Sequence, residues 1–188
     1  MKFFKFVFIT LVFVCGFLGY LIWNHFKSPD FGGDFTLTYQ AQPWKFSQEP
    51  PPLTLLYFGY AKCPDVCPMT LSYAGGAFRQ LDKKQLKQTR LVFVSVDQKH
   101  DNPQDVADYA KNFFESFIGL SGSQEQIDSA IKLFPASYIV EDNPKSYLGY
   151  SISHTDKIFF LNRRGRVVDS LQSPRDSEMI YKKIQENL

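Results

Sequence analysis

The sequence predicts an α/β domain with a mixed central sheet, preceded by one transmembrane helix. Short apolar runs of strand length alternate with segments of helical periodicity, which is typical of α/β folds. A hairpin pattern followed by a helix closes the chain and adds antiparallel strands to that sheet. The third observation is a long uncharged run near the N-terminus.

The uncharged run covers residues 6–23, and at about 1.5 Å per residue it is just long enough to cross the hydrocarbon core of a bilayer. Lys2 and Lys5 precede it, so the positive-inside rule predicts a cytoplasmic N-terminus and an exported C-terminal part. A cleaved signal peptide is the alternative. A retained anchor is favoured, because the run is longer than a signal core and ends in aromatic residues rather than in a small-residue cleavage site.

We therefore expect an anchor at residues 1–27, a linker at residues 28–33 and one domain at residues 34–188. About 155 residues suffice for a single sizeable core. The formal net charge is +2 and both signs are mixed along the chain, so no basic stripe indicates nucleic acid as a partner. Cys15 lies inside the apolar run and is interpreted as apolar filler, because large residues precede it where lipid attachment needs small ones.

Strand and helix patterns alternate along the domain. Strands are expected at residues 35–39, 53–60, 91–96, 158–161 and 166–168, and helices at residues 69–81, 103–114, 127–134 and 178–187. The 53–60 run is mostly apolar, as expected of a strand buried on both faces. Gly165 occupies a permissive position in the turn between the last two strands. A thioredoxin-like layout is the simplest arrangement of these elements.

Cys63 and Cys67 are the two thiols of the domain, and they follow the 53–60 strand in the motif CPDVCP. In an open α/β sheet, sites form at this carboxyl end of the strands. A residue before proline is pushed out of the helical region, so both cysteines are expected to be extended, with Cys67 as the N-cap and Pro68 as the first helical residue. The positive end of the helix then lowers the pKa of the thiols.

Three residues between the cysteines permit either a disulfide or a shared metal ion. A permanent structural disulfide is disfavoured, because so short a ring constrains little chain entropy. His154 lies in a predicted loop just before the 158–161 strand, which the thioredoxin-like layout brings beside the first helix. Two thiolates and one imidazole make a soft site of low coordination number that suits Cu(I). His25 and His100 are interpreted as ordinary polar residues.

The chain resembles the Sco/SenC family over nearly all of the predicted domain. The matching motifs are YFGYAKCPDVCP at residues 57–68, SVD at 95–97, DNP at 101–103, FIGLSG at 117–122, and His154 with FFL at 159–161 and GR at 165–166. The resemblance implies a membrane-anchored, thioredoxin-like protein that binds copper and assists assembly of the dinuclear copper centre in subunit II of cytochrome c oxidase. Carried over residue by residue, Cys63, Cys67 and His154 match the copper ligands of that family.

The resemblance also implies Cu(I) as the bound state, with Cu(II) as an alternative, and an upstream protein that donates the copper. The implied location is the inner (cytoplasmic) membrane as a single-pass protein whose domain faces the periplasm, or the mitochondrial inner membrane in a eukaryote. Asp97 matches an acidic position near the site, and the capping of a turn explains this residue equally well. Ala61, Gln98 and His100 depart from the family pattern without removing a ligand.

Two functions of different classes stay open at this point. One is copper delivery by ligand exchange. The other is a membrane-anchored thiol-disulfide reductase that maintains the cysteines of the oxidase subunit, with Cys63 attacking and Cys67 resolving a mixed disulfide. His154 discriminates between them, because the reductase needs no histidine. A peroxidase is disfavoured, since no Pro-x-x-x-Thr-x-x-Cys pattern surrounds either thiol, and a structural zinc site is disfavoured, since it usually wants four protein ligands.

Overall fold

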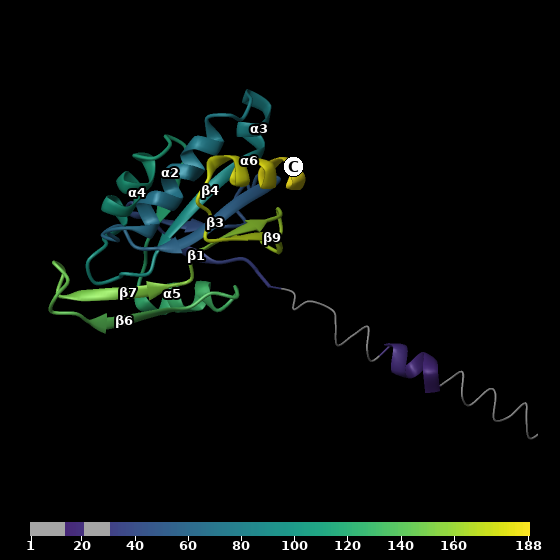
Figure 1. Ribbon diagram of the computed structural model, residues 1–188, viewed down its shortest axis with the longest axis horizontal. Helices are drawn as coiled ribbons and strands as arrows, with labels where there is room; N and C mark the ends of the chain where they lie inside the picture. Colours follow the sequence, from purple (N-terminus) through teal and green to yellow (C-terminus); the bar gives the residue numbers. More distant parts are fainter. Residues whose placement is uncertain (1–13, 21–30) are drawn as a thin grey trace, which may run out of the picture. The chain divides into compact units, whose positions relative to one another are not determined.

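A five-stranded mixed sheet in the order β5-β4-β3-β8-β9 forms the centre of the domain (Figure 1). The computed structural model describes residues 14–20 and 31–188, and Phe31–Leu188 forms one compact unit. The strands of the sheet are β3 (Leu53–Gly59), β4 (Thr89–Ser95), β5 (Ile118–Leu120), β8 (Lys157–Leu161) and β9 (Val167–Gln172). β3, β4 and β5 run parallel, whereas β8 is antiparallel to β3 and to β9. The mixed sheet predicted from the sequence is confirmed.

Helices cover both faces of this sheet (Figure 1). They are α2 (Val66–Phe78), α3 (Lys83–Gln88), α4 (Pro103–Lys111), α5 (Gln124–Ile131) and α6 (Ser177–Asn187). α2 and α6 pack against each other on one face, while α5 contacts β1 (Thr36–Tyr39) on the other. All seven residues of β3 are buried between these layers, as its apolar run predicted.

Several helices begin at a residue whose side chain caps them. Asn102 accepts a hydrogen bond from the Asp105 backbone N–H, and Pro103 occupies a first-turn position that needs no N–H donor. Asp82 and Ser123 each form a capping box at the start of α3 and α5. The side chains that cap these helices are therefore provided locally by the sequence.

The start of α2 differs from the prediction. The helix begins at Val66 with Asp65 as N-cap, so Cys67 lies inside the first helical turn and Pro68 one residue further. The first N–H groups of a helix have no partner within the helix, so a proline in the first turn costs no hydrogen bond. Complete burial of the Cys67 side chain outweighs the preference of a residue before proline for an extended backbone.

The sequence analysis did not predict the hairpin formed by β6 (Tyr138–Asp142) and β7 (Tyr150–His154). Four of the five residues of β6 are exposed, so this strand lacks the alternation that marks a half-buried strand. The same analysis missed α3, β5 and the strand β2 (Gln42–Lys45), which pairs with β1. These elements are short, and neighbouring segments rather than their own periodicity stabilise them.

The predicted membrane anchor falls mostly outside the described residues. Residues 14–20 are helical and exposed, and this segment is part of the first of two units into which the chain divides, Met1–Asp30. Within the described ranges, no helix combines the length and apolar character needed to cross a bilayer. The anchor at residues 1–27 and the linker that follows it therefore stay predictions.

The contact between α4 and β5 allows no side chain at Gly119. A Cβ there would lie 2.0 Å from the Val106 carbonyl oxygen and 3.0 Å from the Ala107 Cα. We expect Gly119→Ala to lower the free energy of unfolding by about 1–3 kcal/mol, because the helix must move off the strand. Urea unfolding followed by circular dichroism measures this. Gly33→Ala is the control, because its Cβ meets only the Leu133 side chain at 3.4 Å; equal stability losses would contradict the packing argument.

Candidate metal centre

The loop that carries Cys63 runs from the end of β3 to the start of α2, and a buried carboxylate fixes it. The Ala61 N–H donates to Asp101 Oδ2 at 2.6 Å, and the Ser95 hydroxyl donates to the same oxygen at 2.7 Å. The Cys63 N–H closes a turn onto the Tyr60 carbonyl at 3.2 Å. Burial raises the pKa of Asp101, and its hydrogen bonds oppose that rise. The position of Cys63 thus depends on a carboxylate that comes from a different loop.

Cys67 occupies space that only a glycine leaves open. A Cβ on Gly59, the last residue of β3, would lie 2.7 Å from Cys67 Sγ and 3.0 Å from a ring carbon of Phe93. The Cys67 side chain is fully buried at this position. Gly59 is therefore a site residue that the sequence analysis did not single out, although it belongs to the run that ends in CPDVCP.

His154 reaches the thiols from the end of β7, and not from a loop as the sequence predicted. Its Nε2 lies 3.2 Å from Cys67 Sγ, and its Nδ1 lies 3.4 Å from the Thr155 carbonyl oxygen. A carbonyl can only accept, so this contact favours the tautomer that carries its proton on Nδ1 and leaves the Nε2 lone pair toward the sulfur. The rings of Tyr57 and Tyr60 stand nearly perpendicular to the imidazole at 6.0 and 6.1 Å and limit its rotation.

Three donor atoms converge as a result. The Sγ atoms of Cys63 and Cys67 and a ring nitrogen of His154 all lie within 4.8 Å of one another. An ion bonded to sulfur at about 2.3 Å and to nitrogen at about 2.0 Å holds its ligands roughly 4 Å apart, so small side-chain shifts close the site around an ion. The residues present therefore fit a soft metal ion of low coordination number.

The two thiols differ in charge. A hydrogen bond from Cys67 lowers the pKa of Cys63 to about 4 against the opposing effect of burial, helped by backbone N–H groups at the helix start. Burial raises the pKa of Cys67, and the neighbouring Cys63 thiolate raises it further. Without metal the pair therefore carries one thiolate, on Cys63, and one thiol that donates to it. Burial likewise raises the pKa of Tyr57 and of Tyr60, so neutral hydroxyls surround the thiolate.

Asp97, His100 and Tyr150 connect β7 to the loop after β4. His100 Nδ1 lies 2.8 Å from Asp97 Oδ1, and the Tyr150 hydroxyl donates to the other carboxylate oxygen. The His100 ring stacks on the Tyr150 ring with 4.5 Å between centroids. Asp97 also caps a turn by accepting the Asp101 N–H on its backbone oxygen at 2.9 Å. Asp97 is not among the three converging donors, but it holds the strand that ends in His154.

Two further contacts hold the β6–β7 hairpin over the site. At the tip, the Tyr147 hydroxyl donates to the Lys62 carbonyl at 3.0 Å, next to Cys63. At the base, the Tyr138 hydroxyl donates to Asp128 on α5 at 2.8 Å. The position of the imidazole therefore depends on contacts along the whole hairpin.

Asp156 completes the surroundings of His154. Its carboxylate accepts hydrogen bonds from the Tyr57 hydroxyl at 3.0 Å and from Arg175 at 2.7 Å. The sequence analysis did not find this residue, because its partners come from β3 and from the segment before α6. Of the other histidines, His100 acts in the Asp97 contact and not as a simple polar residue, and His25 lies outside the described residues.

The absence of a side chain at Gly59 determines where the Cys67 sulfur lies relative to Cys63. We expect Gly59→Ala to displace Cys67 Sγ and so to weaken its hydrogen bond to Cys63, which raises the pKa of Cys63. Thiolate absorbance at 240 nm, followed against pH on the reduced metal-free protein, measures this shift. Gly33→Ala serves as the control, and an unchanged thiol titration in Gly59→Ala would refute the close approach.

The low pKa of Cys63 can be tested by following its thiolate as pH falls. The thiolate should persist as pH falls from 9 to 5 and disappear only near the pKa of about 4. Cys67→Ala removes the donor and should shift the titration upward toward the ordinary cysteine value of about 8.5, whereas Cys67→Ser keeps a donor and should shift it less. The pH dependence of alkylation of Cys63, read by mass spectrometry, measures all three proteins. Identical profiles would show that Cys67 does not stabilise the thiolate.

Comparison with known proteins places these features in one family. The sequence model described as SCO1/SenC matches residues 24–188. The chain is 27% identical over 158 residues to the mitochondrial protein SCO2 of Saccharomyces cerevisiae, covering 84% of this chain and 52% of that protein. The chain spans little more than half the length of the curated relatives it matches.

Two solved structures share the fold. Apo Sco1 of Thermus thermophilus superposes with a TM-score of 0.77 at 32% identity, covering 86% of this chain and 94% of that one. ScoI of Arabidopsis thaliana, solved with copper bound, superposes with a TM-score of 0.76 at 26% identity, covering 84% and 97%. These neighbours confirm the thioredoxin-like α/β fold. Together with the match of the family model over most of the sequence, they show that the chain belongs to the SCO1/SenC family.

Proposed function

We propose that this protein is a copper-delivery protein that binds copper through Cys63, Cys67 and His154. The convergence of these three donors within 4.8 Å carries the proposal. Soft thiolate ligands select Cu(I), and a neutral imidazole adds a third ligand without adding charge. Family relatives solved with copper bound support the choice of metal.

Copper is the cargo, and the three side chains play unequal parts in carrying it. Cys63 is already a thiolate and keeps 8% of its surface exposed, so it is the first sulfur that an incoming ion meets. Cys67 is completely buried and must lose its proton before it binds. Binding therefore releases a proton and becomes weaker as pH falls.

His154 is the most exposed of the three donors. It therefore marks the side on which a ligand from another protein can add before an original ligand leaves, and this exchange requires no free copper. The Thr155 carbonyl favours the tautomer that binding needs, and the two tyrosine rings limit the rotation of the imidazole.

The proposed destination is the dinuclear copper centre in subunit II of cytochrome c oxidase, and the proposed source is an upstream copper donor protein. We propose that the N-terminal segment anchors the protein in the inner membrane, with the domain on the periplasmic side, or in the mitochondrial inner membrane in a eukaryote. Relatives named as mitochondrial SCO proteins and the uncharged run at residues 6–23 support this placement. Cu(I) is the proposed carried state, with Cu(II) as an alternative.

The pairing of one thiolate with one thiol favours a second candidate, thiol-disulfide reduction. The Cys63 thiolate would attack one sulfur of a partner disulfide and expel the other as a thiolate that takes up a proton. Cys67 would then lose its proton and attack the Cys63 sulfur of the mixed disulfide. The partner gains two electrons and two thiols, and Cys63 and Cys67 end as a disulfide.

A competition titration separates the two functions. The reduced protein, kept free of oxygen, is titrated with Cu(I) against a chromophoric chelator. We expect one ion per chain, and we expect Cys63→Ala, Cys67→Ala and His154→Ala each to weaken binding by at least the 10- to 100-fold that loss of an outer-shell partner costs. Met179→Ala is the control, because it removes an exposed thioether on α6 that is not among the three donors.

Disulfide exchange with a model peptide is measured on the same proteins. His154→Ala should keep most of this exchange activity while its copper binding is lost, because the exchange steps use only the two thiols. Weak copper binding by the unaltered protein, or binding indifferent to His154, would overturn copper delivery and leave the reductase.

A further inference from the structure

A cleft lies at the end of the sheet opposite the thiols. It measures about 510 Å³ and is lined by Pro52, Gln88, Asn162, Arg163, Arg164 and Leu188. Pro52 precedes the first residue of β3, and Gln88 precedes the residue of β4 that pairs with it. Cys67 Sγ packs against Gly59 at the other end of β3, seven residues along. At about 3.3 Å per residue, the cleft and the metal centre are separated by roughly 20 Å.

Arg163 and Arg164 give the cleft its charge. Both are exposed, and neither forms an ion pair within residues 31–188. The turn that carries them is fixed, because Asn162 Oδ1 accepts the N–H groups of Arg164 and Arg166 at 2.9 and 3.2 Å. Two guanidinium groups on a rigid turn, beside the amides of Gln88 and Asn162, suit a phosphate group.

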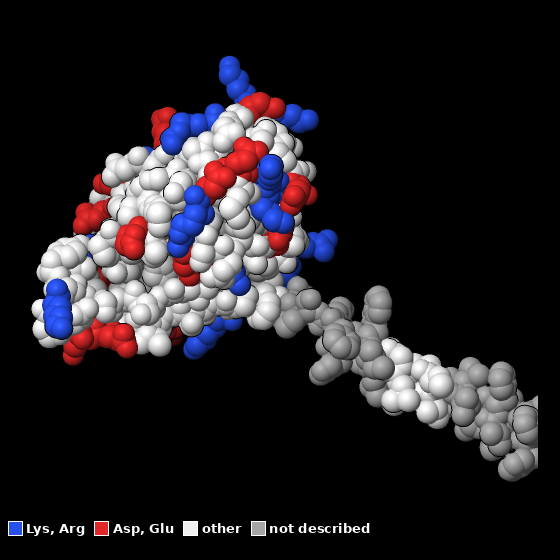
Figure 2. Space-filling view, in the orientation of Figure 1, with Lys and Arg blue, Asp and Glu red and all other residues white. Residues whose placement is uncertain are grey.

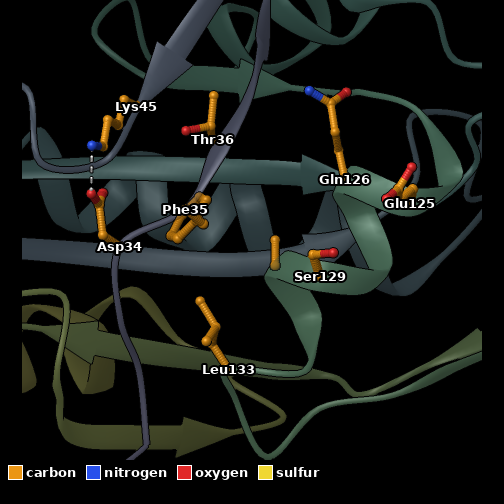
Figure 3. Close-up of a pocket in the computed structure, with 9 residues that line it drawn as sticks. Asp34, Phe35, Thr36, Lys45, Glu125, Gln126, Ser129 and Leu133 are labelled. Atoms are coloured by element: carbon orange, nitrogen blue, oxygen red, sulfur yellow. Dashed lines mark ion pairs between the residues drawn. The ribbon is translucent and has the colours of Figure 1, made fainter.

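A second hollow of the domain has no such unpaired arginines. It measures about 470 Å³ and lies between β1 and α5 (Figure 3). Its lysine, Lys45, is paired with Asp34 at 3.1 Å, and Glu125 adds a further negative charge at its rim. Figure 2 shows both signs of charge interspersed over the face in view, so this face carries no extended patch of one sign.

The chain leaves the domain beside these arginines. The Val167 N–H donates to the Phe31 carbonyl at 3.0 Å, and the Gly33 N–H donates to the Gly165 carbonyl at 3.0 Å. Residues 24–30 separate this point from the uncharged run, and a chain of that length spans at most about 25 Å. If residues 6–23 span a bilayer, the arginine turn lies within reach of its surface, and the tether keeps the effective concentration of lipid high.

We infer that the cleft at Arg163 and Arg164 binds the phosphate head groups of anionic lipids in the membrane that holds the N-terminal segment. The end of the domain that carries these arginines then faces the bilayer, and the thiols face away from it, toward soluble partner domains. This inference rests on the anchor included in the proposed function. Each basic residue near an anionic surface favours association about fivefold, so two change the bound fraction enough to set the orientation of a tethered domain.

The test uses the full chain in nanodiscs whose lipids carry a paramagnetic gadolinium head group, with methyl-labelled protein. With anionic lipid, we expect strong relaxation at the methyl groups of Val168 and Leu188 near the cleft and little at Ile139 and Val140 on the hairpin. Arg163→Glu with Arg164→Glu should abolish this difference. The control Lys99→Glu with Lys145→Glu makes the same charge change at exposed lysines away from the cleft and should preserve it.

Further arms separate the sources of failure. Purely zwitterionic lipid should reduce the relaxation, and inorganic phosphate should reduce it no more than sodium chloride of equal ionic strength. Displacement by phosphate alone would make the cleft a site for small anions and overturn the lipid assignment.

Methyl groups of Val14 and Leu18 report whether the chain is anchored. If they respond while the two ends of the domain do not differ, the orientation is wrong; if they do not respond, the inference fails with the anchor. The copper titration uses no lipid, so its outcome is independent of these measurements.

Discussion

The metal centre depends on one close approach, that of the Cys67 sulfur to the backbone at the end of β3. The sulfur fits there because Gly59 has no side chain, and the Cys63 loop and the β6–β7 hairpin bring the other two donors to it. With Cys67 buried in the first turn of α2, its thiol points at Cys63 and at the imidazole of His154 together. Burial on both faces of β3 fixes the strand, and so the sulfur has little freedom to move.

Burial also sets the electrostatics of the pair. The two sulfurs are too close to ionise together without a cation, so one keeps its proton and donates a hydrogen bond to the other. A bound ion supplies the missing positive charge and removes the reason for that proton to stay. The same arrangement therefore provides one thiolate when metal is absent and two when metal is present, so the two proposed functions, copper delivery and disulfide exchange, would use the same site.

The β6–β7 hairpin supplies the third donor from a distance. His154 is 87 residues from Cys67 along the chain, and contacts at the tip, middle and base of the hairpin hold it in place. β6 is exposed along most of its length, so the hairpin is held by these polar contacts together with Tyr150 and Ile152 of β7, which are buried in the core. The hairpin lies at the end of the sheet where a partner can approach, while the chain leaves the domain at the other end.

The sequence by itself determined the parts of this protein whose physics is local. Apolar runs predicted the buried strands β3, β4 and β8, and Pro103 predicted the start of α4. The motif CPDVCP and its resemblance to one family identified both thiols and the histidine. Local patterns did not give β6, which has no alternation, or the true start of α2, where burial of Cys67 overrides the preference set by Pro68.

Only the tertiary structure decided how the site is assembled. The roles of Gly59, Asp101 and Asp156 come from contacts with residues far away in the chain, and their residue types alone do not indicate such partners. The same holds for Asp97, whose carboxylate binds Tyr150 and His100 from different elements. A sequence specifies such contacts only through the packing of the whole domain, because each one requires strands and loops to meet that no local propensity brings together.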